Sequence, residues 1–266
     1  MTEHTANMDI TKKNQKYYFN ILALDRSRST ISDIVISQKA GAISLGEVAR
    51  VISPMGNEKL YLKRDVKCTC GAKVKECEFW REIFYKADHV NTYFKTYLNA
   101  SYSLCDSSKT IRHSKIVRSY ISDNELMGVL VLRDFNEWSS SVKRALKTKS
   151  EGQFRQIFKD RKFWKSSIRL SMRRFYVFRV VDYTLTNLRL ARELSNYSNR
   201  VIIDNSRDFD MFDSFSKNSK DTLTSKKHII RGNRIMAAEK NMDFWELNHP
   251  LSRFLAWMIK FALKVQ

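Results

Sequence analysis

Short apolar runs that each stop at a polar turn constrain this chain more than any other feature. The clearest runs are residues 17–25 (YYFNILALD) and 128–134 (GVLVLRD), and helical patterning follows each of them. Shorter runs of the same kind occupy residues 41–47, 102–109 and 199–206. Strands that alternate with helices form parallel βαβ units, whose sheet is covered on both faces. The pattern therefore predicts an α/β fold with a central parallel sheet flanked by helices.

The domain organisation follows from length and from the scarcity of chain-breaking residues. The chain has 266 residues with only 7 Gly and 2 Pro, which favours helices over long linkers. Residues 1–16 are polar and are predicted to be a flexible tail, and residues 17–266 are predicted to be one domain. Helices are expected over residues 31–40, 111–121 and 136–149, in a basic and aromatic helical insertion over about 150–196, and in the C-terminal segment from 251.

The charge balance favours an anionic partner. Lys and Arg total 48 against 28 Asp and Glu, a formal charge of +20, which suits nucleic acid, an anionic membrane face or a polyanionic small molecule. No secretory signal is present, and no run approaches the roughly 20 apolar residues that span a bilayer, so a cytoplasmic location is expected. The basic region 143–179 lacks a groove-reading motif, which makes nucleic acid the less favoured partner. Its aromatic residues are expected in the core: Phe154, Phe158, Phe163, Trp164, Phe175 and Tyr176.

Three of the predicted strands end in turns that contain phosphate-binding residue types. Residues 26–30 (RSRST) follow the first strand and precede a helix, residues 106–109 (DSSK) follow another, and Arg133 follows a third. Ligands of open parallel sheets lie beyond the carboxyl ends of the strands, where helix N-termini also favour anions. The turns therefore predict an anionic ligand. A nucleoside-triphosphate loop G-x-x-x-x-G-K-[ST] is absent, which disfavours a P-loop kinase.

Five segments of the chain, in the expected order, resemble segments of the sulfotransferases that use 3′-phosphoadenosine 5′-phosphosulfate (PAPS). The loop in LDRSRSTISD resembles the family's G-R-S-G-[ST]-T loop, with Leu45-Gly46-Glu47 following it at a fitting distance. Three further segments match in order: CTCGAKVKECEFW (68–80), CDSSK (105–109) and VLVLRDFNEWSSSVKR (129–144). A last segment, HIIRGNR (228–234), resembles the family's H-x-x-x-G-N-R. The resemblance implies a P-loop-like sulfotransferase fold, with PAPS as cofactor.

The resemblance also assigns roles to individual residues. The loop side chains Arg26, Ser27, Arg28, Ser29 and Thr30 would surround the 5′-phosphosulfate, while Arg133, Ser141 and Arg234 would bind the rest of the cofactor, with Arg133 and Ser141 on its 3′-phosphate. Arginine forms bidentate, charge-assisted bonds to phosphate, which suits these roles. Arg28 stands where the family has a glycine, and glycine adopts a positive φ at little cost whereas arginine does not.

Sulfuryl transfer to a hydroxyl, or less readily to an amine, requires a general base and charge stabilisation on the leaving phosphate. Glu47 is the candidate base and Lys109 the candidate stabilising cation. The alternative bases are His113 and His228, and the alternative state of Glu47 is a carboxylate paired with Arg50. The expected acceptor is an unidentified small molecule or a saccharide. The alternative function is a basic protein that binds nucleic acid or a membrane surface on a degenerate sulfotransferase fold.

Two further features are predicted to be structural. Cys68, Cys70 and Cys77 have the spacing C-x-C-x6-C, which is not the paired C-x-x-C of common zinc modules, so buried thiols or one disulfide are expected rather than a metal site; a zinc site completed by Cys105 or a histidine is the alternative. The C-terminal helix carries Arg253, Lys260 and Lys264 on one narrow stripe. That helix is expected to cover the core, and peripheral attachment to an anionic membrane is its alternative role.

Overall fold

A five-stranded, all-parallel sheet forms the centre of the computed structural model, which describes residues 16–52, 68, 70, 72–73, 76–81, 83, 88–149, 172–173, 175–215 and 246–264. The strands lie in the order β2-β3-β1-β4-β5, with bounds β1 Tyr18–Ala23, β2 Ile43–Gly46, β3 Leu104–Asp106, β4 Leu126–Val131 and β5 Asn199–Ile203. The central strand β1 pairs in parallel with β3 on one side and with β4 on the other. The predicted α/β fold with a central parallel sheet is confirmed.

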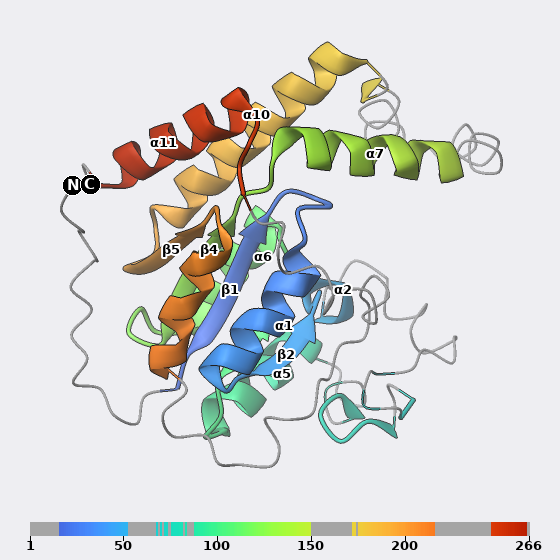
Figure 1. The fold of residues 1–266 in the computed structure, drawn as a ribbon. Helices are drawn as coiled ribbons and strands as arrows, with labels where there is room; N and C mark the ends of the chain where they lie inside the picture. The colour runs from blue at the N-terminus through green and yellow to red at the C-terminus, as the bar shows by residue number, and fades with distance from the viewer. Residues whose placement is uncertain are drawn as a thin grey trace.

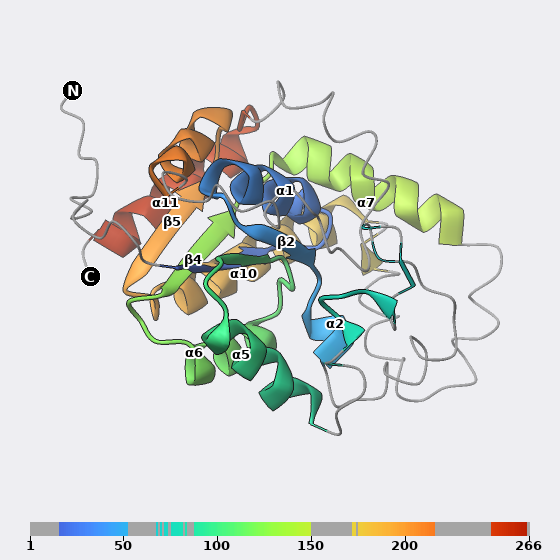
Figure 2. The same cartoon turned by 90° about the horizontal axis from the view of Figure 1, so that it is seen from below.

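Helices cover both faces of this sheet (Figures 1 and 2). They are α1 Ser29–Ala40, α2 Ala49–Ile52, α5 His89–Asn99, α6 Ile111–Tyr120, α7 Phe135–Lys149, α10 Tyr176–Leu194, the 3-10 helix η3 Ser206–Phe215 and α11 Pro250–Lys264. Helices α1 and η3 pack together on one face, and the opposite face is covered by α5, α6 and α10, with α11 against α10. Each strand that leads to a helix does so from its carboxyl end, so the connecting loops gather along one edge of the sheet.

The side chains of β1 alternate between the two faces of the sheet and contribute to the core on both faces. Tyr18 and Leu22 belong to the cluster under α5, α6 and α10, whereas Phe19 and Ile21 belong to the cluster under α1 and η3. All six residues of β1 are buried, as expected for a central strand of a parallel sheet. Packing is tight enough that a Cβ at Gly128 in β4 would lie 2.6 Å from the ring of Tyr197. A side chain at that position would force the end of α10 away from the sheet.

The segments predicted as strands and helices match the structure to within a few residues wherever the structure describes them. The sequence pattern missed α5, which is amphipathic and buries Tyr93, Phe94 and Tyr97. The expectation that Phe175 and Tyr176 lie in the core is wrong, because their exposed fractions are 64% and 55%. The polar tail 1–15 and most of the first half of the predicted insertion, residues 150–171, lie outside the described residues. Within that insertion, the described part contains α10, which follows α7 in the chain and leads into β5.

Candidate active site

The loop between β1 and α1 has an unusual backbone. Arg26 and Arg28 have φ angles of 68° and 60°, in the left-handed region. Arg28 is the N-cap of α1, with no capping hydrogen bond from its side chain and no acidic residue in the first helical turn. A left-handed conformation costs a non-glycine residue roughly 1–2 kcal/mol, and such residues concentrate at functional sites. Arg28 therefore adopts the backbone conformation that favours glycine in a phosphate-binding loop, and it leaves the N–H groups of the first turn directed at the loop.

A cluster of ionic bonds joins this loop to the loop after β4. The Nη2 atom of Arg28 lies 2.8 Å from Oε2 of Glu137, and Nε of Arg133 donates to the same oxygen at 3.2 Å. Nη1 of Arg133 also donates to the backbone carbonyl of Arg26 at 2.5 Å. Burial, and secondarily the charge of Arg28, lower the pKa of Arg133. Two guanidinium groups share one carboxylate, so the cluster keeps an excess of positive charge between the two loops.

The two predicted catalytic side chains, Glu47 and Lys109, lie together. Glu47 follows β2 and Lys109 follows β3, and Nζ of Lys109 donates to Oε1 of Glu47 at 2.6 Å. Each side chain is 13% exposed, so the ion pair is largely shielded from water while keeping an open side. Lys109 has a φ of 65°, and it is the third non-glycine residue in the left-handed region among the described residues. The side chain of Arg50, the alternative partner of Glu47, lies outside the described part of the structure.

The buried carboxyl of Asp33 links the start of α1 to the ends of β2 and β3. Asp33 lies on α1, one turn after Ser29, and its Oδ2 accepts hydrogen bonds from the N–H of Gly46 at 2.8 Å and from Oγ of Ser107 at 3.0 Å. Burial raises the pKa of Asp33 to about 7. Through Asp33 the start of α1 is fixed against the ends of β2 and β3, beside Glu47 and Lys109. The sequence reasoning missed this residue, although an acid inside an apolar helical pattern was a usable signal.

A second buried carboxyl, Asp106, supports the turn after β3. Its oxygens accept from the hydroxyl of Tyr18 at 2.8 Å, from the N–H of Ser108 at 2.9 Å and from the Ser108 hydroxyl. Nε2 of His113 lies 2.5 Å from Asp106, and His113 is 3% exposed. A histidine enclosed in this way has no path to an acceptor molecule, so its position argues against the role of alternative base. His113 instead fixes the base of the turn that carries Lys109.

The remaining predicted residues are distributed over the same edge. Ser27 in the loop and Ser29 at the start of α1 are buried, Arg26 is exposed, and Thr30 is half-buried on the first turn of α1. Ser141 is half-buried on α7, one turn beyond Glu137, so it shares a helix face with the arginine cluster. Arg234 and His228 lie outside the described residues. The structure thus brings together the loops after β1 and β4 through Glu137, and those after β2 and β3 through the Glu47–Lys109 pair.

Comparisons with protein-family models, with curated proteins and with solved structures found no match for this chain. Its function is therefore inferred from its own residues.

Proposed function

We propose that this protein is a PAPS-dependent sulfotransferase that moves a sulfuryl group to a hydroxyl, or less readily to an amine, of an acceptor. The observation that carries the proposal is the cluster in which Arg28 and Arg133 share Glu137. These two arginines come from the loops that the sequence resemblance assigns to the two phosphate groups of the cofactor. A cofactor with phosphates at both its 3′ and 5′ positions would need positive charge at both loops together.

In the proposed complex the 5′-phosphosulfate lies over the N-terminus of α1. Its oxygens accept from backbone N–H groups there, and from Arg26, Ser27, Ser29 and Thr30. Arg133 and Ser141 hold the 3′-phosphate, and Arg28 turns from Glu137 toward the anion. Arg234 is retained as a further cofactor ligand on the basis of the sequence resemblance alone.

The chemistry proposed for the Glu47–Lys109 pair is an in-line displacement at sulfur. The acceptor oxygen forms a bond to sulfur while its proton passes to Glu47. The bond between sulfur and the bridging phosphate oxygen breaks, and the electron pair stays on the leaving adenosine 3′,5′-bisphosphate. Lys109 stabilises the charge that develops on that oxygen. The proposed acceptor class is a saccharide hydroxyl, because the net charge of +20 suits an anionic saccharide chain.

Calorimetry with adenosine 3′,5′-bisphosphate, the expected product, tests the cofactor. We expect a measurable affinity that falls about 10- to 150-fold in Arg133→Ala, because bonds to a charged group contribute roughly 1.5–3 kcal/mol. Arg192→Ala is the matched control, since this exposed arginine lies in the last turn of α10, which leads to the amino end of β5. Absence of heat at millimolar ligand, or equal losses in both variants, would contradict the proposal.

Turnover separates catalysis from binding. Glu47→Gln should leave the affinity for adenosine 3′,5′-bisphosphate within about threefold of wild type while reducing turnover of PAPS by roughly 100-fold or more, the usual contribution of a general base. The assay measures release of the bisphosphate in the presence of hydroxyl-bearing saccharides. A fully active Glu47→Gln protein would remove this residue from the reaction.

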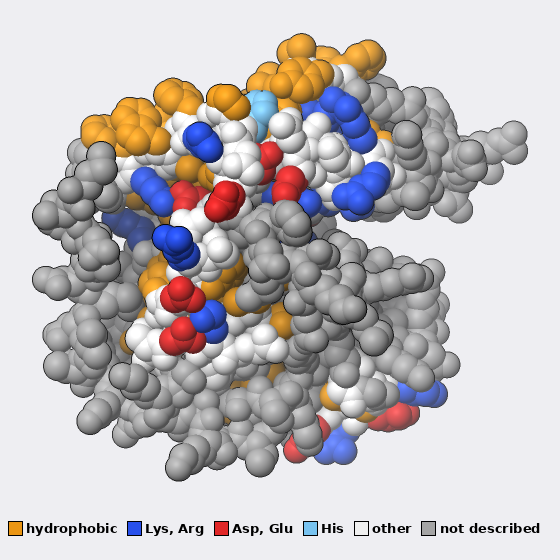
Figure 3. Space-filling model, viewed as in Figure 1, with side chains coloured by type: hydrophobic (Ala, Val, Ile, Leu, Met, Phe, Trp, Pro, Cys, Tyr) orange, Lys and Arg blue, Asp and Glu red, His pale blue; other side chains and the backbone are white. Residues whose placement is uncertain are grey.

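A second candidate function, binding to an anionic membrane surface, is favoured by an exposed aromatic face. Helix α11 buries Leu255 and Ile259 but exposes Phe254, Trp257 and Phe261, at 56%, 61% and 60%. These three rings follow one another with centroid separations of 6.1 and 5.8 Å. Figure 3 shows that apolar side chains over α11 and α10 gather on the same side of the molecule. No helix within the described residues is long and apolar enough to cross a membrane.

Helix α10 continues this surface. Phe175, the N-cap of α10, is exposed, as are Val177, Phe178, Val181 and Leu185 in the first half of the helix. Arg173 and Arg189 line the hollow beside Phe178. Exposed aromatic residues flanked by cations are typical of helices that lie in the membrane interface. On α11 the flanking cations are Arg253 and Lys260, of which Lys260 also pairs with Asp204 at 2.7 Å.

Sedimentation with vesicles tests the membrane candidate. Vesicles that contain phosphatidylserine should bind the protein more tightly than pure phosphatidylcholine, and Phe254→Ser/Trp257→Ser/Phe261→Ser should weaken binding about tenfold or more. Leu98→Ser is the control, because Leu98 is 46% exposed on α5, away from this surface. Equal binding to both vesicle types, or no effect of the triple change, would reject this candidate.

A further inference from the structure

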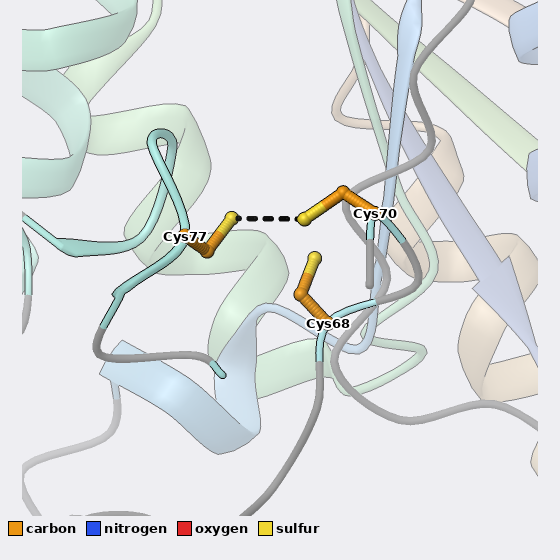
Figure 4. A group of neighbouring side chains, drawn as sticks. All are labelled: Cys68, Cys70 and Cys77. Carbon is orange, nitrogen blue, oxygen red and sulfur yellow. Dashed lines mark hydrogen bonds between the residues drawn. The ribbon is translucent and has the colours of Figure 1, made fainter. Parts of the chain in front are cut away.

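Three cysteine sulfurs converge at one point beside the core. The Sγ atoms of Cys68, Cys70 and Cys77 all lie within 4.8 Å of one another, and those of Cys70 and Cys77 are 3.6 Å apart. Figure 4 shows the three side chains directed toward a common centre. None of the three forms a disulfide. Cys77 lies seven positions after Cys70 and nine after Cys68, so the chain folds back on itself to bring its sulfur to the other two.

The distances between the Sγ atoms suit a shared metal ion better than a disulfide. Zinc binds thiolates at about 2.3 Å in a tetrahedron, which places the sulfurs roughly 3.8 Å apart. The 3.6 Å between Cys70 and Cys77 is close to that value, whereas a disulfide would bring two sulfurs to about 2.05 Å and leave the third without a role. The geometry therefore involves all three cysteines.

The backbone holds the three sulfurs in place. The N–H of Cys68 donates to the carbonyl of Ala72 at 2.8 Å, and the N–H of Cys77 donates to that of Lys73 at 2.8 Å. Cys68 and Cys77 are 3% and 0% exposed, whereas Cys70 is exposed. The hydrogen bond with Cys77 and burial raise the pKa of Cys68, while the backbone N–H of Cys70 acts in the opposite direction. A bound divalent cation deprotonates cysteine ligands, so metal binding by these sulfurs would release protons.

We propose that Cys68, Cys70 and Cys77 bind a thiophilic divalent cation, with Zn²⁺ as the best match. Within the described residues these three cysteines supply three of the four ligands of a tetrahedral zinc site, and water or an external ligand would complete it. Cys105, the fourth ligand considered from the sequence, lies in β3 among the residues packed under α1. It does not belong to this cluster. The structure has thiols rather than a disulfide, with Cys68 and Cys77 buried as the sequence predicts and Cys70 exposed; the proposal adds a cation to these three sulfurs.

The position of the cluster assigns the cation a structural role. Cys77 leads into Trp80, which is fully buried and stacks on Tyr93 with ring centroids 6.3 Å apart. The hydroxyl of Tyr93 lies 2.9 Å from that of Tyr18, which donates to Asp106 beneath the Lys109 turn. A cation at the cysteines would fix residues 68–80 against α5 and so support this hydrogen-bonded chain. The proposal of a cation at the three cysteines does not depend on the proposed sulfuryl transfer.

Metal titration of the reduced full-length protein tests the site. We expect one zinc per chain, and we expect Co²⁺ to give a thiolate-to-cobalt charge-transfer absorbance that Zn²⁺ abolishes, with protons released on binding. Cys70→Ser should weaken binding roughly tenfold or more without unfolding the protein, because its side chain is exposed. Cys105→Ser is the matched control and should bind metal like wild type; its hydroxyl can bond to the Asp33 and Ser37 side chains that contact the cysteine.

Three results would overturn the proposal. One is a reduced protein that shows no cobalt–thiolate absorbance and binds no stoichiometric zinc. Another is metal binding that is undiminished in Cys70→Ser, and the third is an equal loss in Cys105→Ser. A Cys70–Cys77 disulfide found by mass spectrometry, together with no metal binding after reduction, would assign the cluster to redox chemistry instead.

Discussion

Replacement of Asp33 by asparagine should make the protein more stable at neutral pH, and the gain should depend on pH in a defined direction. Asp33 is fully buried, and burial raises its pKa from 3.8 to about 7. Its folded pKa therefore lies above its unfolded pKa, so the folded state retains a proton that the unfolded state has lost. Below about pH 4 both states are protonated and the carboxyl carries no penalty. Between about pH 4 and 7 the free energy of unfolding falls as pH rises, and above pH 7 the full penalty remains.

The magnitude follows from the difference between the two pKa values. A difference of about 3 units, at roughly 1.4 kcal/mol per unit, corresponds to about 4 kcal/mol, of which about 3 kcal/mol appears between pH 4.5 and 8. Asparagine is neutral at every pH. Its amide oxygen, placed as Oδ2, can still accept from Gly46 and Ser107, and its NH2 group, placed as Oδ1, can donate to the hydroxyl of Ser37. The stability of Asp33→Asn relative to wild type should therefore rise by about 3 kcal/mol over this pH range.

Urea denaturation at several pH values measures this difference directly. Subtracting the unfolding free energy of wild type from that of Asp33→Asn at each pH cancels the titration of other groups. This holds provided that the dependence of the unfolding free energy on urea is the same in both proteins. Asp123→Asn is the control, because that side chain is exposed and its removal should leave the pH dependence as in wild type. A difference that stays flat between pH 4.5 and 8, or that falls with rising pH, would refute the assignment of Asp33 as a buried carboxyl with a raised pKa.

Two further predictions concern the arginine cluster. Arg28→Gly should be more stable than Arg28→Ala by about 1 kcal/mol in urea denaturation, because both lose the same side chain but only glycine adopts a φ of 60° without strain; the reverse order would show that Arg28 is not left-handed. Glu137→Gln should tighten calorimetric binding of adenosine 3′,5′-bisphosphate by a few-fold, about 1 kcal/mol, because a carboxylate that competes with phosphate for Arg28 and Arg133 is removed. Weaker binding would mean that Glu137 chiefly positions these arginines.

The sheet was predictable because its strands are short, apolar and bounded by polar turns. Periodicity located β1 and β4 to within a few residues, and the position of each polar turn at a strand end indicated the edge at which a ligand would lie. Helix α5 was missed because its buried face is made of tyrosine and phenylalanine spaced among polar residues. Its helical form depends on packing against β1 and Trp80, which no local pattern reports.

The site was predictable only in part, because its bonds join residues far apart in the chain. The pair of Glu47 and Lys109 joins the ends of two different strands, and no local pattern indicates the register between β2 and β3. Glu137 was not recognised, since an acid on a basic helix suggests only a local ion pair with Arg133 at i−4. The left-handed backbone of Arg28 is imposed by the loop between β1 and α1, so residue type alone argued against it.

The exposed aromatic face of α10 and α11 shows a further limit of sequence patterns. Apolar residues at helical spacing predict a buried face, and α11 does bury Leu255 and Ile259. A second apolar face, which includes Trp257, is exposed. The hydrophobic pattern could not show this, because it does not indicate how many faces of a helix are covered by other helices or strands.

We propose that the loops after β1 and β4 hold an adenosine nucleotide by phosphates at both its 5′ and 3′ positions. Calorimetric affinities for adenosine 3′,5′-bisphosphate and for adenosine 5′-monophosphate test this, because the two ligands differ only in the 3′-phosphate. We expect wild type to prefer the bisphosphate by about tenfold or more, the value of charge-assisted bonds to Arg133, and we expect Arg133→Ala to lose this preference. Equal affinities in wild type, or a preference that survives in Arg133→Ala, would contradict it.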